Sequence, residues 1–178
     1  GPQGLAGQLL EATPVAADGV PDGVVVERIV YLSDGLRVVG YRAAPREVRS
    51  LPVILYNRGG NRDFGQWTDG RAAIRLGEMA GWGYLVLATQ YRGVDGGDGI
   101  EEFGGAEVND ILNLLSVAAS DARADTTRVG MFGWSRGGMM TYLVLKQTDR
   151  FKAAITGAAP SNEIAVGIAR ELQEKSLF

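Results

Sequence analysis

Three stretches of the chain are apolar almost throughout, and they constrain the fold more than any other feature of the sequence. They are residues 53–56, 84–89 and 129–134. A β-strand that does not alternate between apolar and polar residues must be covered on both faces, which is typical of the inner strands of a parallel sheet. The sequence therefore predicts a sheet with helices packed on both of its sides.

Helical periodicity fills the segments between these runs. Residues 71–80 carry their small and apolar side chains on one face. Residues 107–120 repeat apolar residues at i, i+3, i+4 and i+7, opposite a polar side that includes Asp110. Residues 137–148 are apolar nearly all round, which predicts a deeply buried helix. This alternation predicts a doubly wound, mostly parallel α/β sheet with right-handed crossovers.

Two further segments extend the pattern. Residues 24–32 and 36–43 flank an Asp-Gly turn signal, and their alternation predicts an antiparallel hairpin at the edge of the sheet. Residues 153–158 predict another strand, and residues 164–175 a last amphipathic helix.

The domain organisation is simple. Residues 1–20 show no strong periodicity and are interpreted as a lead-in. Its first two residues, Gly1 and Pro2, are consistent with the scar that a protease leaves when it removes a purification tag. We expect residues 21–178 to form part of one α/β domain, because no internal linker is long enough to divide it.

Composition excludes several classes of function. The formal net charge is -3, and the 18 Lys and Arg residues are scattered, so we expect no nucleic-acid partner. No apolar run approaches the roughly 20 residues that span a bilayer, and the first residues lack a signal-peptide pattern, so we expect a soluble protein without a membrane partner. Its compartment is left open. The chain contains no cysteine and no histidine, which removes the usual metal ligands and the commonest base of acyl transfer, and we expect neither metal nor cofactor.

One motif carries chemistry. Residues 133–137 read Gly-Trp-Ser-Arg-Gly, directly after a predicted buried strand and before a predicted buried helix. This G-x-S-x-G pattern marks a nucleophile elbow, in which a sharp turn lifts Ser135 above the sheet and leaves room only for small neighbours. The turn directs the Arg136 amide toward a developing oxyanion. A chain with 26 glycines forms this pattern by chance as well, but its position between strand and helix favours the catalytic interpretation.

A second oxyanion donor is expected in the loop after the strand at residues 53–56. That loop reads Arg-Gly-Gly-Asn over residues 58–61, and glycine lets the backbone turn an amide into the site. We expect an amide of this loop to take that role. A plain Gly-Gly turn is the alternative, but the position of the loop ahead of Ser135 favours the oxyanion hole.

Together these elements resemble the catalytic domain of the prolyl oligopeptidase family of serine peptidases, which has the α/β-hydrolase fold. The resemblance rests on Ser-Asp-Gly-Leu at 33–36, Ile-Leu-Tyr-Asn-Arg-Gly-Gly at 54–60, Tyr-Arg-Gly at 91–93 and Gly-Trp-Ser-Arg-Gly-Gly at 133–138. It implies that Ser135 is the acylated nucleophile and that the amides of Gly60 and Arg136 form the oxyanion hole. Tyr91 and Arg92 are expected to make local structural contacts.

The chain departs from the family in two respects. Arg58 stands where such enzymes often carry histidine, and together with Trp134 it is a candidate for the wall of the substrate pocket. In this fold the triad acid and histidine follow the serine along the chain, on loops after later strands. Those C-terminal strands are missing here, so the resemblance implies that a second chain or another segment supplies the Asp and His.

Two functions follow as alternatives. The first is a serine hydrolase that cleaves a peptide or a small ester by acyl transfer through Ser135. The second is a catalytically inactive hydrolase-like fragment or pseudoenzyme that serves as a binding or assembly module. The sequence does not separate amide from ester cleavage. A parallel sheet that ends at residues 153–158 also exposes a strand edge, and we expect this edge to pair with a partner or to cause aggregation.

The remaining acidic residues offer a weaker candidate. Asp95, Asp98, Glu101 and Glu102 cluster in a glycine-rich loop but lack the regular spacing of a calcium loop. We expect a solvated loop there. The glycines of residues 93–99 lack the Lys-Ser or Lys-Thr of a phosphate-binding loop, which argues against a nucleotide site.

Overall fold

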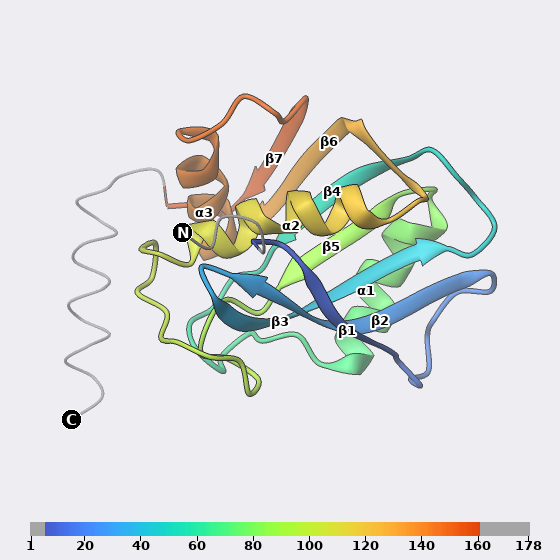
Figure 1. Cartoon of the computed structure of the whole chain (residues 1–178), viewed down its shortest axis with the longest axis horizontal. Coiled ribbons are helices and arrows are strands. Elements are labelled where there is room, and N and C mark those ends of the chain that lie inside the picture. Colours follow the sequence, from blue (N-terminus) through green and yellow to red (C-terminus); the bar gives the residue numbers. More distant parts are fainter. Residues whose placement is uncertain (1–5, 161–178) are drawn as a thin grey trace.

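The computed structural model describes residues 6–160, which form one sheet of seven strands and three helices (Figure 1). The elements are β1 (Leu9–Pro14), β2 (Val24–Ser33), β3 (Leu36–Pro45), β4 (Leu51–Asn57), α1 (Asp69–Gly81), β5 (Leu85–Thr89), α2 (Val108–Ser120), β6 (Ala124–Trp134), α3 (Arg136–Leu145) and β7 (Ala153–Gly157). The strand order is β1-β2-β3-β5-β4-β6-β7. Strands β5, β4, β6 and β7 run parallel, whereas β1, β2 and β3 pair antiparallel, so the predicted α/β sheet is confirmed.

The helices cover the two faces of the sheet unequally. In Figure 1, α2 and α3 lie in front of the sheet and α1 lies behind it. Helix α1 packs on β2, β3 and β5, while α2 and α3 together cover β4, β5, β6 and β7 from the other side. On the sheet face that carries α1, strands β4, β6 and β7 are therefore less covered than on the opposite face. Trp82 and Ile155 lie on this face and are 65% and 64% exposed.

Local sequence explains the hairpin and the start of α1. Strands β2 and β3 pair from Val24 to Ser33, and the turn residues Asp34 and Gly35 both have positive φ, at 52° and 81°. Two positive φ angles are what a two-residue hairpin turn of right-handed twist requires. Helix α1 begins after Thr68, whose hydroxyl accepts a hydrogen bond from the backbone N–H of Arg71 at 3.3 Å.

Two predictions about the N-terminal region are wrong. The hairpin is not at the edge of the sheet, because β1 pairs antiparallel with β2 and occupies that edge itself. Residues 9–14 therefore belong to the sheet, although the sequence indicated a lead-in over residues 1–20. The sequence does not predict β1, because most of its side chains are exposed and its residues therefore do not alternate between apolar and polar.

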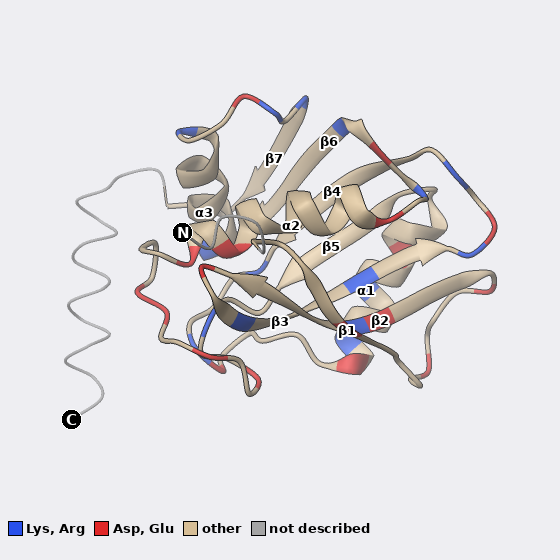
Figure 2. Cartoon of the chain, in the orientation of Figure 1, with Lys and Arg blue, Asp and Glu red and all other residues tan. Residues whose placement is uncertain are grey.

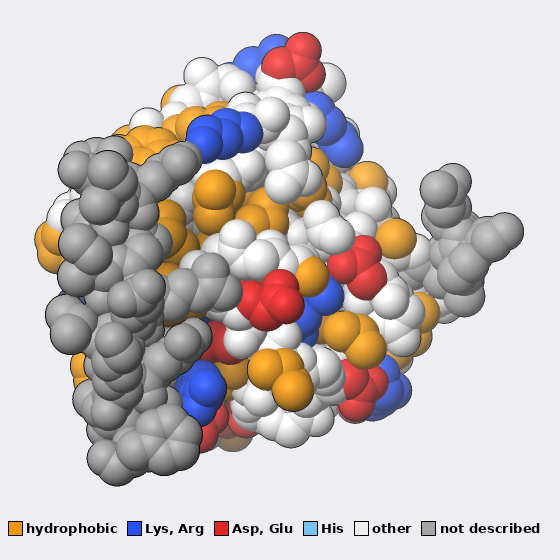
Figure 3. All heavy atoms as spheres, turned by 90° about the vertical axis from the view of Figure 1, so that its left-hand side faces the viewer, with side chains coloured by type: hydrophobic (Ala, Val, Ile, Leu, Met, Phe, Trp, Pro, Cys, Tyr) orange, Lys and Arg blue, Asp and Glu red, His pale blue; other side chains and the backbone are white. Residues whose placement is uncertain are grey.

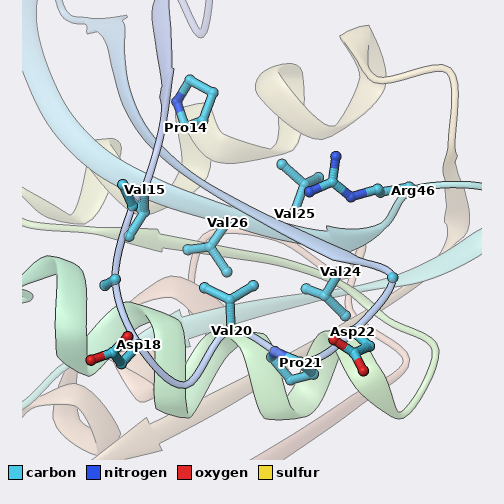
Figure 4. A pocket seen from close by; sticks show the side chains of 13 residues that line it. Pro14, Val15, Asp18, Val20, Pro21, Asp22, Val24, Val25, Val26 and Arg46 are labelled. Atoms are coloured by element: carbon cyan, nitrogen blue, oxygen red, sulfur yellow. The ribbon is translucent and has the colours of Figure 1, made fainter.

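The connection between β1 and β2 also packs on the domain. Its side chains border a hollow of about 450 Å³, and Figure 4 shows Val15, Val20 and Val26 directed toward one another there. These valines join the apolar cluster beneath α1. The lining includes both Asp18 and Asp22 and the basic Arg46, and Asp18 and Arg46 lie on opposite sides of the hollow (Figure 4). Because charges of one sign do not converge there, we interpret the hollow as a packing seam rather than a binding site.

The burial of two helices differs from expectation. Asp110 was placed on the polar side of α2, yet it is fully buried, accepting hydrogen bonds from the Arg92 guanidinium at 2.7 Å and the Ser33 hydroxyl at 2.6 Å. A buried carboxylate is tolerated because these donors replace water. Helix α3 was expected to be buried all round, but Tyr142 and Leu145 are each 40% exposed.

The described part of the sheet ends at β7. This strand pairs only with β6 among residues 6–160, so the expected open strand edge is present there, and its pairing with a partner stays a prediction. The helix predicted over residues 164–175 lies outside the described residues. None of the helices within residues 6–160 is long and apolar enough to cross a bilayer.

Candidate active site

Ser135 lies at the junction of β6 and α3 in a strained backbone conformation. Its φ is 54° and its ψ is -123°, a combination that residues with a side chain rarely adopt and that costs about 1–3 kcal/mol. The turn is held on both sides, since the Ser135 amide donates to the Gly157 carbonyl at 2.8 Å and its carbonyl accepts from the Gly138 amide at 2.9 Å. The predicted strand, sharp turn and helix are therefore confirmed.

The two glycines of the motif are required by close backbone packing. A β-carbon on Gly133 would lie 2.3 Å from the carbonyl oxygen of Gly137. A β-carbon on Gly137 would lie 1.9 Å from the carbonyl oxygen of Asn57. Both distances are far below van der Waals contact, so β4, β6 and α3 approach this closely only because side chains are absent here.

The two backbone amides predicted as oxyanion donors belong to Arg136, at the start of α3, and to Gly60, in the loop after β4. Arg136 is the first residue of α3. The first N–H groups of a helix have no acceptor within that helix, and the Arg136 amide is one of them. The loop after β4 packs directly against the serine, because a β-carbon on Gly59 would lie 3.2 Å from Ser135 Cβ and 3.8 Å from Ser135 Oγ. Gly60 has a φ of 79°, and a β-carbon there would lie 2.0 Å from the Phe64 carbonyl oxygen.

Two arginine side chains fix the orientation of this loop. Arg58 Nη1 donates to the Gly59 carbonyl at 3.1 Å, and Arg136 Nη1 donates to the Gly60 carbonyl at 3.2 Å. The C=O and N–H of one trans peptide point in opposite directions. By holding the Gly59 carbonyl, Arg58 therefore also sets the direction of the Gly60 N–H.

The same two arginines form a buried network with an aromatic ring and two carboxylates. Their guanidinium carbons lie 4.9 Å (Arg58) and 4.7 Å (Arg136) from the centre of the Tyr91 ring. Glu101 accepts a hydrogen bond from Arg136 Nη1 at 2.9 Å and lies 3.8 Å from Arg58 Nη2. Glu107 accepts from Arg136 Nη2 at 2.8 Å. Each buried cation thus has a carboxylate within reach, as burial of charge demands.

Burial shifts the protonation equilibria of this network. It raises the pKa of Tyr91 to about 12 despite the opposing positive charges of Arg136 and Arg58, so the phenol is neutral and donates to the Arg58 carbonyl at 3.0 Å. Burial lowers the pKa of the Arg58 guanidinium below its usual range. Burial alone would raise the pKa of Glu107, but three backbone amides, led by that of Gly104, and the charge of Arg136 outweigh it, and the pKa lies below its ordinary value.

The two candidates for the pocket wall have different surroundings. Trp134 is 55% exposed, and with Ser135 and Arg58 it borders a pocket of about 620 Å³. The side chain of Arg58, in contrast, is only 2% exposed, and its N–H groups make five hydrogen bonds to backbone carbonyls. The acceptors are the carbonyl oxygens of Gly59, Arg62, Phe64 and Gln90. Arg58 therefore lines the pocket, but its N–H groups are already hydrogen-bonded to backbone carbonyls of the surrounding loops.

One carboxylate of the glycine-rich loop was misjudged from the sequence. Figure 2 shows acidic residues along the connection between β5 and α2, where a solvated loop was predicted. Glu101 is buried between Arg58 and Arg136, so the prediction is wrong for this residue. The others, Asp95, Asp98 and Glu102, bind different parts of the chain. No three Asp or Glu side chains within residues 6–160 converge as a metal ion would need.

Glu101 and Glu107 are site-supporting residues that the sequence did not reveal. They lie 35 and 29 residues from Arg136 in the chain, and no local sequence pattern predicts a contact over such a separation. The Tyr91 and Arg92 side chains do make the local structural contacts expected for them, with the Arg58 carbonyl and with Asp110.

Comparison with known proteins agrees with this geometry. The sequence profile of the family described as the prolyl oligopeptidase family matches residues 73–172. The uncharacterized peptidase YtmA of Bacillus subtilis is 37% identical over 115 residues, which cover 65% of this chain and 43% of YtmA. Human dipeptidyl peptidase 8 is 30% identical over 161 residues, covering 80% of this chain and 18% of that protein.

Solved structures show the same fold. The acylaminoacyl peptidase of Pyrococcus horikoshii superposes with a TM-score of 0.63 and 26% identity, over 79% of this chain and 24% of that one. An acetyl xylan esterase from Paenibacillus sp. R4 superposes with a TM-score of 0.63 at 22% identity, over 81% of this chain and 51% of the esterase. The chain thus spans about half the length, or less, of these relatives.

Proposed function

Because the chain belongs to the prolyl oligopeptidase family, we propose that it carries the nucleophile of a serine hydrolase that cleaves a peptide or a small ester. The observation that carries the proposal is the conformation of Ser135, at a φ of 54° on a turn where Gly133 and Gly137 leave no room for a side chain. Strain of this kind persists where the surrounding structure imposes it, and it concentrates at functional sites.

The proposed reaction is acyl transfer in two halves. Ser135 Oγ attacks the substrate carbonyl while a base removes its proton, and the amides of Gly60 and Arg136 donate to the oxyanion of the tetrahedral intermediate. The intermediate collapses to an acyl-serine as the protonated base returns the proton to the leaving amine or alcohol. Water then attacks the acyl-serine by the same route, releasing the acid and restoring the hydroxyl.

The base of this reaction has to come from outside the 178 residues, since they contain no histidine. We propose that a segment or chain beyond these residues supplies a histidine and the acid that orients it. The open edge of β7 and the uncovered face of β4, β6 and β7 support this proposal, because both are surfaces that further structure would cover.

A fluorophosphonate probe followed by intact-mass analysis tests the nucleophile. The probe is applied to the 178-residue chain and to the longest natural polypeptide that contains it. We expect one adduct, on Ser135, in the natural polypeptide, and little or none in the 178-residue chain, which lacks the base. In the natural polypeptide the adduct should be absent from Ser135→Ala and retained in the control Ser116→Ala, whose serine is exposed on α2. A natural polypeptide that folds but acquires no adduct at Ser135 would refute the proposal.

The absence of histidine also favours a second candidate function, an inactive hydrolase-like module that binds a partner. Without triad partners, what remains of catalysis is only about a thousand- to ten-thousandfold over water, from binding and the oxyanion hole. If this view is correct, neither the chain nor the natural polypeptide turns over p-nitrophenyl acetate. Turnover that disappears in Ser135→Ala contradicts it.

A further inference from the structure

The pocket beside Ser135 has an unusual charge distribution. Its walls include the aromatic rings of Tyr56, Trp67 and Trp134, and it encloses about 620 Å³. Arg71 and Arg75 line it from α1, and no Asp or Glu of residues 6–160 does so. The chain as a whole carries a formal charge of -3, so this concentration of positive charge is local. Acidic, basic and hydrophobic side chains are instead interspersed on the face of the molecule shown in Figure 3.

The two arginines lie one helical turn apart and have no carboxylate partner. Neither Arg71 nor Arg75 forms an ion pair with any residue of the described range 6–160, although most other arginines of that range do. Like charges at i and i+4 destabilise a helix slightly, and no ion pair within the described residues relieves this repulsion. Arg71 is held in place by a hydrogen bond to the Gln66 carbonyl at 2.6 Å and by the Trp67 ring, 5.7 Å away.

The positive charge reaches the sheet at the floor of the pocket. Burial raises the pKa of Tyr56, and the charges of Arg75 and Arg71 act in the opposite direction. Both arginines line the same pocket as Tyr56, which lies near the end of β4. Arg58 lines the same pocket, but its donors are occupied by backbone carbonyls, which leaves Arg71 and Arg75 to meet a ligand.

We propose that this pocket binds a substrate group that carries a carboxylate on an apolar body, with the carboxylate at Arg71 and Arg75 and the reacting carbonyl at Ser135. The inference rests on the proposed function, because it places the selected group next to the proposed nucleophile. A guanidinium matches a carboxylate in geometry and charge, and aromatic walls accept the apolar part. In a peptide, the carboxylate is that of an acidic side chain or of the C-terminus.

Binding of a matched pair of ligands tests the proposal without any turnover. The ligands are 2-naphthoate and the neutral 2-naphthamide, and their binding to the Ser135→Ala chain is measured by isothermal titration calorimetry. We expect naphthoate to bind about tenfold more tightly than the amide. Arg75→Gln should remove about that factor for naphthoate and leave the amide unaffected, and Arg150→Gln, an exposed arginine without an ion pair among residues 6–160, should change neither.

Three outcomes would overturn the proposal. The first is equal affinity for the two ligands, and the second is unchanged naphthoate affinity in Arg75→Gln. The third is no saturable binding of naphthoate, which is the result expected if an acidic segment of another chain fills the pocket instead. Circular dichroism of Arg75→Gln checks that the variant folds, and the same titration of Arg71→Gln provides a second variant. Two short peptides, one with an internal Glu and an amidated end and one with a free C-terminus and no acidic side chain, distinguish the sources of the carboxylate.

The proposed nucleophile is tested separately. Selective naphthoate binding without a fluorophosphonate adduct at Ser135 would remove the proposed function and leave a binding site. An adduct at Ser135 without selectivity for naphthoate would remove this inference and leave the nucleophile.

Discussion

Two pairs of arginines border the same serine and have opposite environments. The side chains of Arg58 and Arg136 are 2% exposed and approach the Glu101 carboxylate within 3.8 Å and 2.9 Å. Arg71 and Arg75 are exposed on α1 and have no carboxylate partner among residues 6–160. A cation taken out of water needs a counter-charge, whereas a cation left in water does not. The buried pair therefore serves the scaffold of the site, and the exposed pair is available to a ligand.

Arg136, the residue that follows Ser135, also has a structural role. The Arg136 amide is a proposed oxyanion donor, and the guanidinium of the same residue bonds to the Gly60 carbonyl and to two buried carboxylates. One residue thereby links the helix N-terminus to the loop that carries the other donor. Loss of a carboxylate partner is expected to disturb both donors together.

The largest effect is expected from Glu107→Ala. This substitution leaves the buried Arg136 guanidinium with one carboxylate fewer, and breaking a buried ion pair typically costs about 3–5 kcal/mol. Urea unfolding measures the loss in the free energy of unfolding. Glu78→Ala, an exposed glutamate on α1, is the control and should change stability by less than about 0.5 kcal/mol. Similar values for both variants would show that the network does not hold the fold.

A smaller effect is expected from Arg58→Lys. Lysine keeps the charge but cannot reproduce five hydrogen bonds to backbone carbonyls, and leaving buried acceptors unpaired costs about 1–3 kcal/mol. Arg71→Lys on the exposed pair should cost less than about 0.5 kcal/mol. Thermal or urea unfolding of the two variants measures the difference, and equal losses would erase the distinction between buried and exposed arginines.

Acidification should weaken the buried network through Glu107. Its pKa in the folded chain lies below the ordinary value of 4.5, so its contribution to stability is present above that pH and is lost as the pH falls through the folded pKa. The stability difference between the wild type and Glu107→Gln should therefore be constant near neutral pH and shrink below about pH 4.5. Urea unfolding from pH 7 to pH 3 measures it. A difference that grows on acidification would reverse the assigned sign.

The smallest effect is expected from Arg75→Gln on the stability of the unliganded chain. An exposed arginine without an ion pair contributes little, so the change should stay within about 0.5 kcal/mol and relief of repulsion from Arg71 can make it stabilising. Thermal unfolding with and without 2-naphthoate measures both states. A large destabilisation without ligand would assign Arg75 to the scaffold rather than to the pocket.

Local patterns in the sequence predicted much of the fold and the centre of the site. Continuous apolar runs identified β4, β5 and β6, because a strand that is buried on both faces is apolar at nearly every position. The hairpin was visible in its Asp-Gly turn, although not its place in the sheet. The turn at Ser135 was visible because Gly133 and Gly137 each lie two residues from the serine, so the motif falls within five consecutive residues.

The sequence by itself determined where the chain turns sharply and which residues stand at that turn. Only the tertiary structure decided that Glu101, Glu107 and Asp110 are buried beside arginines, that residues 9–14 form the edge strand, and that Arg71 and Arg75 line the same pocket as Ser135. The reason is that a turn depends on the steric demands of neighbouring residues, whereas the partner of a buried charge comes from a distant segment, which the fold alone brings within reach.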